Sequence, residues 1–285
     1  MEGARLLVLT SRPLGWIALS SVFFASAWFS GAAGEHPVFI ALMTLALSFP
    51  MCLNGYGLND VYDLDSDRRN PRKKVRIETD EDRRLVLVGA HVSAGIVILV
   101  SFLSLNPMTI GFSVGLVAAS YIYSVSPIRL RQRPPFDSVI NGFGYFLLPA
   151  LMGWSLGKPL SYLPRDVYLV ATGMMAIHAF CSIMDYTPDK QAGHRTFAIV
   201  FGKRPTALVS TLIMGGITIL LPFWYPAFCT AISLVIWIHP SERWAKIGAW
   251  LIYIGFIVAI ITYFFFLGDH FGNPFRRRPA PFIPL

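Results

Sequence analysis

The chain has 285 residues, of which 54% are hydrophobic and only 14% are charged, and its formal net charge is +8. This composition is typical of a membrane protein and excludes an ordinary soluble enzyme or a basic module that binds nucleic acid. The excess of positive charge is expected to set the membrane topology and to contact anionic lipid.

Apolar runs of about 20 residues recur along the whole chain, and a helix of that length spans a bilayer core of about 30 Å. They predict one all-α domain over residues 1–285, a polytopic membrane helical bundle of about nine transmembrane helices around a central cavity. The first run is long and another follows it directly, which favours a retained helix over a signal peptide. The predicted spans are 14–33, 37–58, 85–105, 108–125, 138–157, 166–184, 206–223, 225–239 and 247–267.

Charged residues are concentrated on one predicted side of the membrane. With the N-terminus in the cytoplasm, the N-terminal segment and the even-numbered loops hold 19 of the 24 Lys and Arg, as expected for short cytoplasmic loops. The C-terminal tail is an exception, because nine spans place Arg276, Arg277 and Arg278 outside. The cytoplasmic side also holds 13 of the 16 Asp and Glu, which the topology rule does not require. We therefore expect a site that uses carboxylates on this face, under a cap formed by residues 59–84.

The first acidic cluster, "NGYGLNDVYDLDSDRRNPRKK", begins within the second predicted span. If that helix continues, Asn59, Asp63 and Asp67 lie on one face at i, i+4 and i+8, with Asp60 beside them. Carboxylates so spaced repel one another unless a cation lies between them, and Mg²⁺ prefers oxygen ligands. The alternative is a solvated acidic cap that pairs with the arginines following it.

The second acidic cluster, "SIMDYTPDKQAGHRTFAIVFGK", follows the sixth predicted span. Asp185 and Asp189 repeat the i, i+4 spacing, and Pro188 indicates that Asp185 closes one helix while Asp189 opens another. Both clusters lie at the cytoplasmic ends of spans, and basic residues follow each. Together they predict a metal-bridged diphosphate site, with the hydrocarbon part of the ligand inside the bundle.

Two polar residues are predicted at membrane depth, where an unpaired polar group is costly and a functional role is the first hypothesis. Asn141 lies in the fifth span, and His178 lies two helical turns before Asp185, so it could line the same cavity. The alternative is a satisfied interhelical hydrogen bond. Aromatic rings that could stabilise a cation belong to Tyr56, Tyr62, Phe143, Tyr145 and Tyr186.

The two acidic motifs of the chain resemble those of a known family. "NDVYDLDSD" matches the pattern NDxxDxxxD and "DYTPD" matches DxxxD, in the order and span context of the UbiA superfamily of intramembrane prenyltransferases. The resemblance covers about residues 10–265. The stretches "SVSPIRLRQRPPFDSVINGFGYFLLPALMGW" and "IHAFCSIMDYTPDKQAGHRT" are most similar to the branch that contains lycopene elongases. Where the ubiquinone and haem branches carry Arg-Pro after the first motif, this chain has "NPRKK".

The resemblance implies roles for the motif residues. Two Mg²⁺ ions and the diphosphate of an allylic donor would be bound by Asn59, Asp60, Asp63, Asp67, Asp185 and Asp189. Direct partners of the diphosphate would be Arg12, Arg68, Lys190 and Arg195. Many members carry a lysine after the tyrosine of the fourth span, whereas here Tyr123 is followed by arginines, among them Arg131, which can hold phosphate bidentately.

The implied reaction is ionisation of an allylic isoprenyl diphosphate and transfer of its prenyl group to a hydrophobic acceptor, with a carotenoid such as lycopene as the best single hypothesis. A terpene cyclase of the same superfamily uses the same motifs without an acceptor and stays open. A transporter is disfavoured because the acids lie at span ends and the span centres are nearly free of charge. The expected partners are the donor, the acceptor and membrane lipid, with no nucleic acid.

Overall fold

The computed structural model describes residues 3–68, 76–221 and 223–262, and these form helices without strands. The predicted all-α fold is therefore confirmed. The N-terminal half contains α1 Gly3–Thr10, η1 Pro13–Gly15, α2 Trp16–Ser30, α3 Ala32–Glu35, α4 Pro37–Leu47, α5 Phe49–Tyr62, α6 Leu64–Asp67, α7 Asp80–Phe102 and α8 Pro107–Ser124. Then follow η2 Leu130–Gln132, α9 Phe136–Gly142, the π-helical η3 Phe143–Leu147, α10 Leu148–Trp154, η4 Leu160–Tyr162, α11 Arg165–Cys181, α12 Tyr186–Ala192, α13 Phe197–Phe201, α14 Lys203–Leu220, α15 Trp224–Ile238 and α16 Glu242–Thr262.

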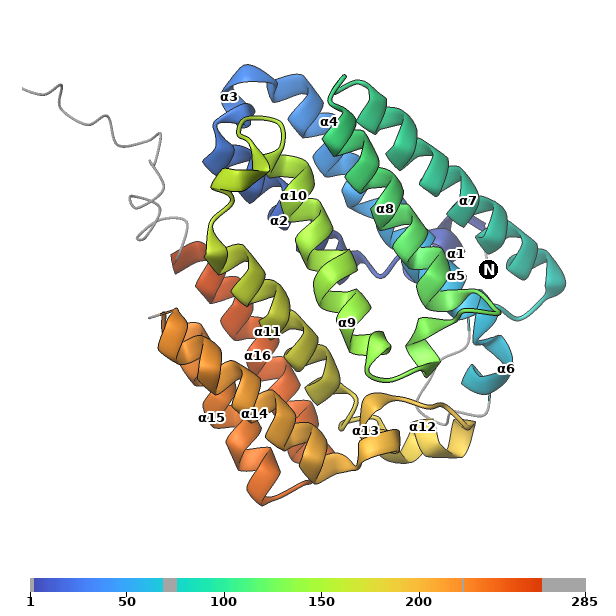
Figure 1. Ribbon diagram of the computed structural model, residues 1–285. Coiled ribbons are helices and arrows are strands. Elements are labelled where there is room, and N and C mark those ends of the chain that lie inside the picture. The colour runs from blue at the N-terminus through green and yellow to red at the C-terminus, as the bar shows by residue number, and fades with distance from the viewer. Residues whose placement is uncertain (1–2, 69–75, 222, 263–285) are drawn as a thin grey trace, which may run out of the picture.

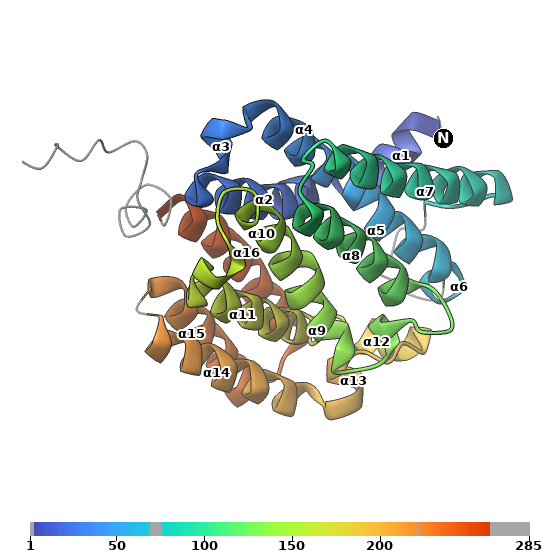
Figure 2. The same cartoon turned by 45° about the horizontal axis from the view of Figure 1, so that its top comes forward.

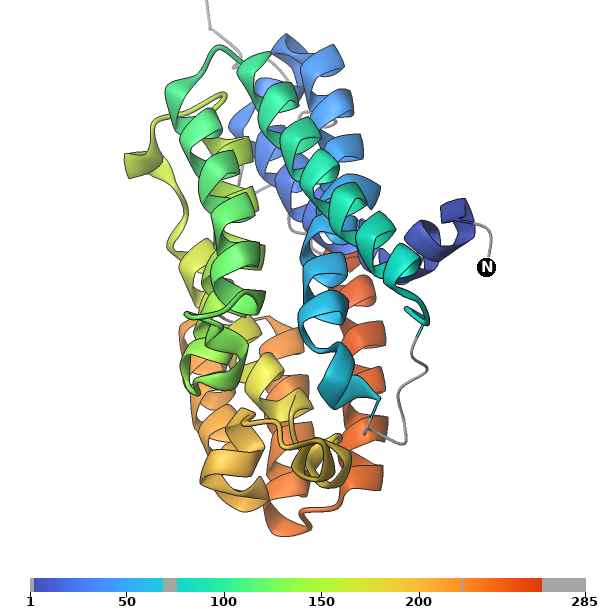
Figure 3. The ribbon, with the colours of Figure 1, turned by 90° about the vertical axis from the view of Figure 1, so that its right-hand side faces the viewer.

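The long helices run side by side, and the short helices lie at their ends. Figure 1 shows α6, α12 and α13 at one end of the bundle and α3 at the opposite end. Figure 2 gives the same arrangement from a second direction. In Figure 3, α1 lies at the side of the bundle next to α7. The two acidic motifs, on α5–α6 and on α12, therefore belong to the same end of the molecule.

The predicted spans coincide with helical segments, some of them broken. By length and composition, the described residues contain four helices that can cross a membrane, namely Pro13–Ser30, Pro37–Tyr62, Asp80–Phe102 and Glu242–Thr262. The pair α11 and α12 also passes as one span if its 72° bend is ignored. The end of the last predicted span and the C-terminal tail with its arginines lie outside the described residues, as does the "NPRKK" segment. The number of about nine spans stays a prediction.

The core is divided between the two halves of the chain. One cluster of buried side chains joins α2, α4, α5, α8 and α10, with Phe23, Met43 and Met152 fully buried. A second cluster joins α11, α14, α15 and α16 around Phe180 and Cys229. Many large apolar side chains on the outer surface are exposed, as is normal where lipid rather than water surrounds a bundle.

Gly153 marks the closest approach of α10 to α2. A Cβ atom at this position would lie 2.4 Å from the Phe23 carbonyl oxygen and 2.7 Å from the Ala27 nitrogen, both backbone atoms. We expect Gly153→Ala to destabilise the bundle by about 1–3 kcal/mol through overpacking, measured as a lower thermal unfolding midpoint in detergent. Gly111→Ala is the control, because a Cβ at Gly111 meets nothing within 4 Å. Equal midpoints for the two variants would contradict this packing.

Candidate active site

The first acidic motif spans a break between two helices. α5 ends at Tyr62 and α6 begins at Leu64, because Asp63 has φ −103° and ψ 1°. The helix of the second predicted span therefore does not continue uninterrupted through the motif. At this break, Asp63 is bonded by arginines of a loop that is distant in the chain. The backbone hydrogen bonds nevertheless keep the i, i+4 spacing of the motif. The Asp63 N–H donates to the Asn59 carbonyl at 3.0 Å, and the Asp67 N–H donates to the Asp63 carbonyl at 2.8 Å.

Two arginines of the loop between α8 and α9 hold the Asp63 carboxylate. Arg129 donates to Asp63 Oδ1 at 2.6 Å and to the Tyr62 carbonyl at 3.0 Å. Arg131 forms an ion pair with Asp63 Oδ2 and donates to the Asn59 side-chain oxygen. Since the Asp63 side chain has no exposed surface, its charge needs such partners. The loop thus brings two cations onto the first motif.

Arg131 lies between the two motifs. Burial lowers the pKa of its guanidinium from the ordinary 12.5 to about 10, and the carboxylates of Asp189, Asp60 and Asp137 act in the opposite direction. The side chain therefore remains cationic at neutral pH. Charges from both motifs therefore act on this one cation.

The second acidic motif follows a sharp bend. α11 ends at Cys181, Asp185 directly precedes α12, and Asp189 lies in the first turn of α12 after Pro188. The predicted break between two helices is confirmed, although α11 closes before it reaches Asp185. Asp189 is buried and Asp185 is half-buried. The short helix α12 thus directs a buried carboxylate back toward the bundle end.

His194 connects the two motifs, a role that the sequence did not reveal. Its Nδ1 lies 3.3 Å from Asp189 Oδ1, and its Nε2 lies 2.6 Å from the Ser66 hydroxyl, next to Asp67 in the chain. The left-handed conformation of Gly193, with φ 77°, ends α12 and allows the chain to turn back. The imidazole is buried. It therefore fixes α12 against α6.

The remaining predicted cations divide into two groups. Arg12 pairs with Asp60 at 2.9 Å and lies over the Tyr56 ring at 4.3 Å, so it contacts the first motif. Lys190 and Arg195 have exposed side chains at the same end of the bundle. Arg68 is also exposed, and it lines a polar hollow of ≈ 550 Å³ between α6 and the start of α7. The structure thus brings Arg12 and Arg131, but not Arg68, against carboxylates of the motifs.

The predicted residues at membrane depth lie below this charged layer. The rings of Tyr123 and Tyr145 meet edge to face with centroids 6.1 Å apart. The Asn141 side chain donates to the Asp137 carbonyl of its own helix at 2.8 Å. His178 Nδ1 lies 3.1 Å from the Ser138 hydroxyl on a neighbouring helix. The interhelical hydrogen bond considered as the alternative is therefore present for His178, whereas the Asn141 bond lies within α9.

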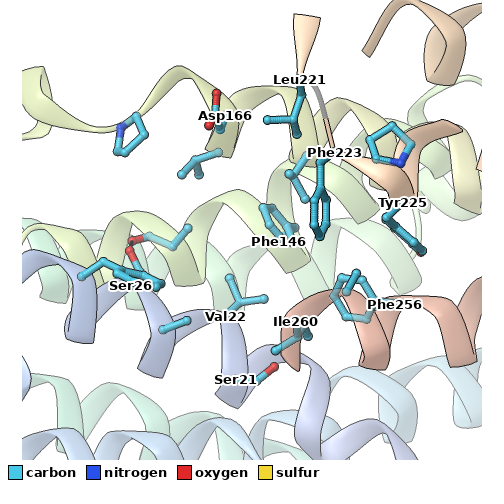
Figure 4. A pocket seen from close by; sticks show the side chains of 18 of the residues that line it. Ser21, Val22, Ser26, Phe146, Asp166, Leu221, Phe223, Tyr225, Phe256 and Ile260 are labelled. Atoms are coloured by element: carbon cyan, nitrogen blue, oxygen red, sulfur yellow. Dashed lines mark hydrogen bonds between the residues drawn. The ribbon is translucent and has the colours of Figure 1, made fainter. Parts of the chain in front are cut away.

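An almost entirely apolar pocket of ≈ 220 Å³ lies between α2, α10, α11 and α16, toward the end of the bundle opposite the motifs (Figure 4). α2, α11 and α16 contribute walls, with side chains such as Val22, Val170 and Phe256, and Phe146 and Phe223 also line it. Asp166 is the acidic residue of the lining. Such a cavity suits a hydrocarbon chain and gives polar ligands few partners.

The oxygen donors of the motifs fit a hard divalent cation that shares its ligands with a substrate. In the described residues, no three His, Cys, Asp or Glu side chains form a group that could hold a metal ion by themselves. Mg²⁺ commonly takes one or two protein carboxylates and completes its shell with water and substrate phosphate. Asn59, Asp63 and Asp189 supply oxygens of the required kind. In this structure Asn59 and Asp63 are bonded to Arg131.

Comparison with known proteins agrees with this geometry. The family model described as UbiA prenyltransferase family matches residues 18–267. The chain is 30% identical to the lycopene elongase/hydratase of Haloarcula japonica, over 70% of this chain and 68% of that protein. It is 26% identical to the lycopene elongase/hydratase of Corynebacterium glutamicum, over 92% of this chain and 96% of that protein.

Two solved structures share the fold. A digeranylgeranylglyceryl phosphate synthase superposes with a TM-score of 0.70 at 16% identity, over 92% of this chain and 98% of that one. A UbiA homologue from Archaeoglobus fulgidus, solved with GPP and Mg²⁺, superposes with a TM-score of 0.60 at 16% identity, over 90% and 99%. At these identities the likeness establishes the arrangement of helices.

Proposed function

The chain belongs to the UbiA prenyltransferase family, and from this premise we propose that it is a Mg²⁺-dependent enzyme that prenylates a carotenoid-type acceptor such as lycopene. Family membership makes it an intramembrane, multi-pass prenyltransferase. The observation that carries the proposal is the position of Arg131, a buried cation between two acidic motifs at the end of an apolar bundle.

The charged layer supports binding of a diphosphate together with metal. A diphosphate would compete with Asp63 for the guanidinium groups of Arg129 and Arg131, which would leave the oxygens of Asp63 available to Mg²⁺. Asn59, Asp63, Asp67, Asp185 and Asp189 are the residues proposed to hold the metal. When bound, Mg²⁺ supplies Lewis-acid stabilisation of the negative charge on the leaving diphosphate.

The layer below supports the carbocation chemistry. Ionisation of the allylic C–O bond leaves a cation that water would capture, so the site must be dry. Tyr123 and Tyr145, whose rings meet edge to face, would stabilise positive charge through their π-systems. Arg129 and Arg131 orient the diphosphate so that the prenyl chain points away from the charged end.

Two observations support a long apolar acceptor. The cavity of ≈ 220 Å³ in Figure 4 has a lining suited to hydrocarbon. Two relatives similar to this chain, one of them along nearly its whole length, are named lycopene elongase/hydratase. We also propose that the motif end faces the cytoplasm, because the loops at that end carry most of the lysines and arginines.

A product assay tests the proposed acceptor. Purified protein in lipid is given Mg²⁺ and dimethylallyl, geranyl or farnesyl diphosphate, each with and without lycopene. We expect an elongated carotenoid that forms only when lycopene is present. A cyclic terpene formed from the diphosphate alone would contradict transfer and favour the cyclase.

His194 provides a further test of the metal site. Because its imidazole orients Asp189 and fixes α6, His194→Ala is expected to raise the Mg²⁺ concentration for half-maximal activity about 10–100-fold. The measurement is a Mg²⁺ titration of the initial rate. The control is His239→Ala, which removes an exposed histidine outside the motifs. An unchanged Mg²⁺ dependence in His194→Ala would show that the orienting bond has no role in metal binding.

A further inference from the structure

A chain of polar groups crosses three helical segments below the arginine loop. The buried Asp137 carboxylate, in the first turn of α9, accepts the Ser138 N–H at 2.8 Å and the Phe197 N–H at 3.2 Å. The Ser138 hydroxyl lies 3.4 Å from Asp137 Oδ1 and 3.1 Å from His178 Nδ1 on α11. The series Asp137, Ser138 and His178 is thus continuous from a carboxylate to an imidazole.

The order of donors in this series fixes the form of the imidazole. An ionised carboxylate only accepts hydrogen bonds, so the Ser138 hydroxyl donates its proton to Asp137. The Ser138 oxygen then accepts a hydrogen bond, which the His178 Nδ1–H donates. In a neutral imidazole with its proton on Nδ1, the lone pair is on Nε2. The network therefore assigns His178 as a base whose free nitrogen is Nε2.

Within the described residues, the Nε2 atom of His178 makes no hydrogen bond. His178 is half-buried, and Nε2 is not among the fully buried polar atoms that lack a partner in the described residues. His178 contacts Ser138 on α9, the helix that follows the loop carrying Arg129 and Arg131. The imidazole thus lies beside the helix that begins directly after the arginine loop.

We propose that His178 is the proton acceptor that completes prenyl transfer, an inference that rests on the function proposed above. The C–O bond pair leaves with the diphosphate, and a double bond of the acceptor supplies the electron pair of the new C–C bond. The adduct is a carbocation. A C–H bond on the adjacent carbon breaks, its electron pair forms a C=C bond, and the proton goes to Nε2 of His178. Asp137 stabilises the resulting imidazolium through Ser138.

The carboxylates near the site are less suited than His178 to accept the proton. Asp63 is held by two cations, Asp189 contacts His194, and both carboxylates are among the residues proposed to hold Mg²⁺, so neither is assigned as the proton acceptor. Asp137 already accepts hydrogen bonds from Ser138 and Phe197. Ser138 and Asp137 are accordingly positioning residues, and His178 is the group that meets the reacting carbon.

The test compares His178→Gln with wild-type protein in the presence of Mg²⁺, a prenyl diphosphate and lycopene. Glutamine retains polar contacts but cannot take up a proton. We expect diphosphate release within about threefold of wild type and an unchanged KM for the donor, while the coupled product falls at least about 100-fold and prenyl alcohol accumulates. Ser138→Ala should lower the ratio of coupled product to prenyl alcohol, but less than His178→Gln does. His91→Gln, which replaces an exposed histidine on α7, is the control.

Each result is decisive. A His178→Gln enzyme that couples at more than a third of the wild-type rate overturns the inference and leaves the proposed function intact. Equal loss of diphosphate release and coupling in folded protein also overturns it, since the role is then structural or in donor binding. Failure of the wild type to form any coupled product overturns the proposed function and the inference together. If His178→Gln does not fold, His178→Asn and Ser138→Ala are read by the same criteria.

Discussion

Replacement of Asp63 by asparagine is expected to lower prenyl transfer by at least about 100-fold, because it removes the charge of the most deeply held carboxylate in the first motif. Asparagine has the same shape and keeps an oxygen that can accept from Arg129. Asp60 and Asp189 still offset the charge of Arg131. The variant should therefore insert and fold, and diphosphate release in the presence of Mg²⁺ measures its loss of activity.

Asp65→Asn is the matched control for this variant. Asp65 lies two residues further along the same motif, but its side chain is exposed and lines the hollow between α6 and α7. We expect Asp65→Asn to retain activity within about twofold, since exposed charges contribute little. Equal activity in the two variants would remove Asp63 from the metal site.

Replacement of Arg131 by glutamine is the second change with a large expected effect. Arg131 bonds Asn59 and Asp63 and lies close enough to Asp189 for that charge to act on it, so it is the cation best placed to bind the diphosphate. Loss of its charge-assisted bonds should lower kcat/KM for the donor about 100-fold, mainly through KM.

The measurement for Arg131→Gln is steady-state kinetics with varied donor. The control is Arg133→Gln, which changes an exposed arginine that donates to the Pro127 carbonyl of its own loop. If Arg131→Gln left KM for the donor unchanged while Arg133→Gln raised it, the assignment of the phosphate-binding arginine would be wrong.

Local sequence patterns predicted the fold class and the two motifs. The apolar runs predicted the long helices, and Pro188 predicted the break between α11 and α12 because proline is tolerated mainly in a first turn. The i, i+4 spacing of Asn59, Asp63 and Asp67 also persists in the backbone hydrogen bonds. These features depend on residues close together in the chain.

The features that the sequence did not predict depend on distant residues. α5 stops at Asp63, where arginines 66 and 68 positions further along the chain bond its carboxylate. His194 meets Ser66 across 128 positions, which no local pattern encodes. Arg68, next to the motif in sequence, is exposed beside α7. Adjacency in sequence was therefore a poor guide to which cations contact the carboxylates.

The position of Asp137 in the sequence is a signal that could have pointed to a polar group at this site. It is an acid at the start of a predicted span, where an uncompensated charge is costly, and it precedes a serine that can bond it. Its partner Phe197 lies 60 positions away, and His178, which contacts Ser138, lies 40 positions from that serine, so the network became visible only in the fold.

The central claim is that the two acidic motifs bind a prenyl diphosphate through a shared metal and Arg131. Calorimetric titration of the purified protein with an unreactive geranyl thiolodiphosphate, in Mg²⁺ and in EDTA, tests this claim without turnover. We predict binding in Mg²⁺ that weakens at least about 100-fold in EDTA and in Asp63→Asn, as expected when an anion loses its charged partners. Binding of equal strength in EDTA, or in Asp63→Asn, would contradict the assignment of the site.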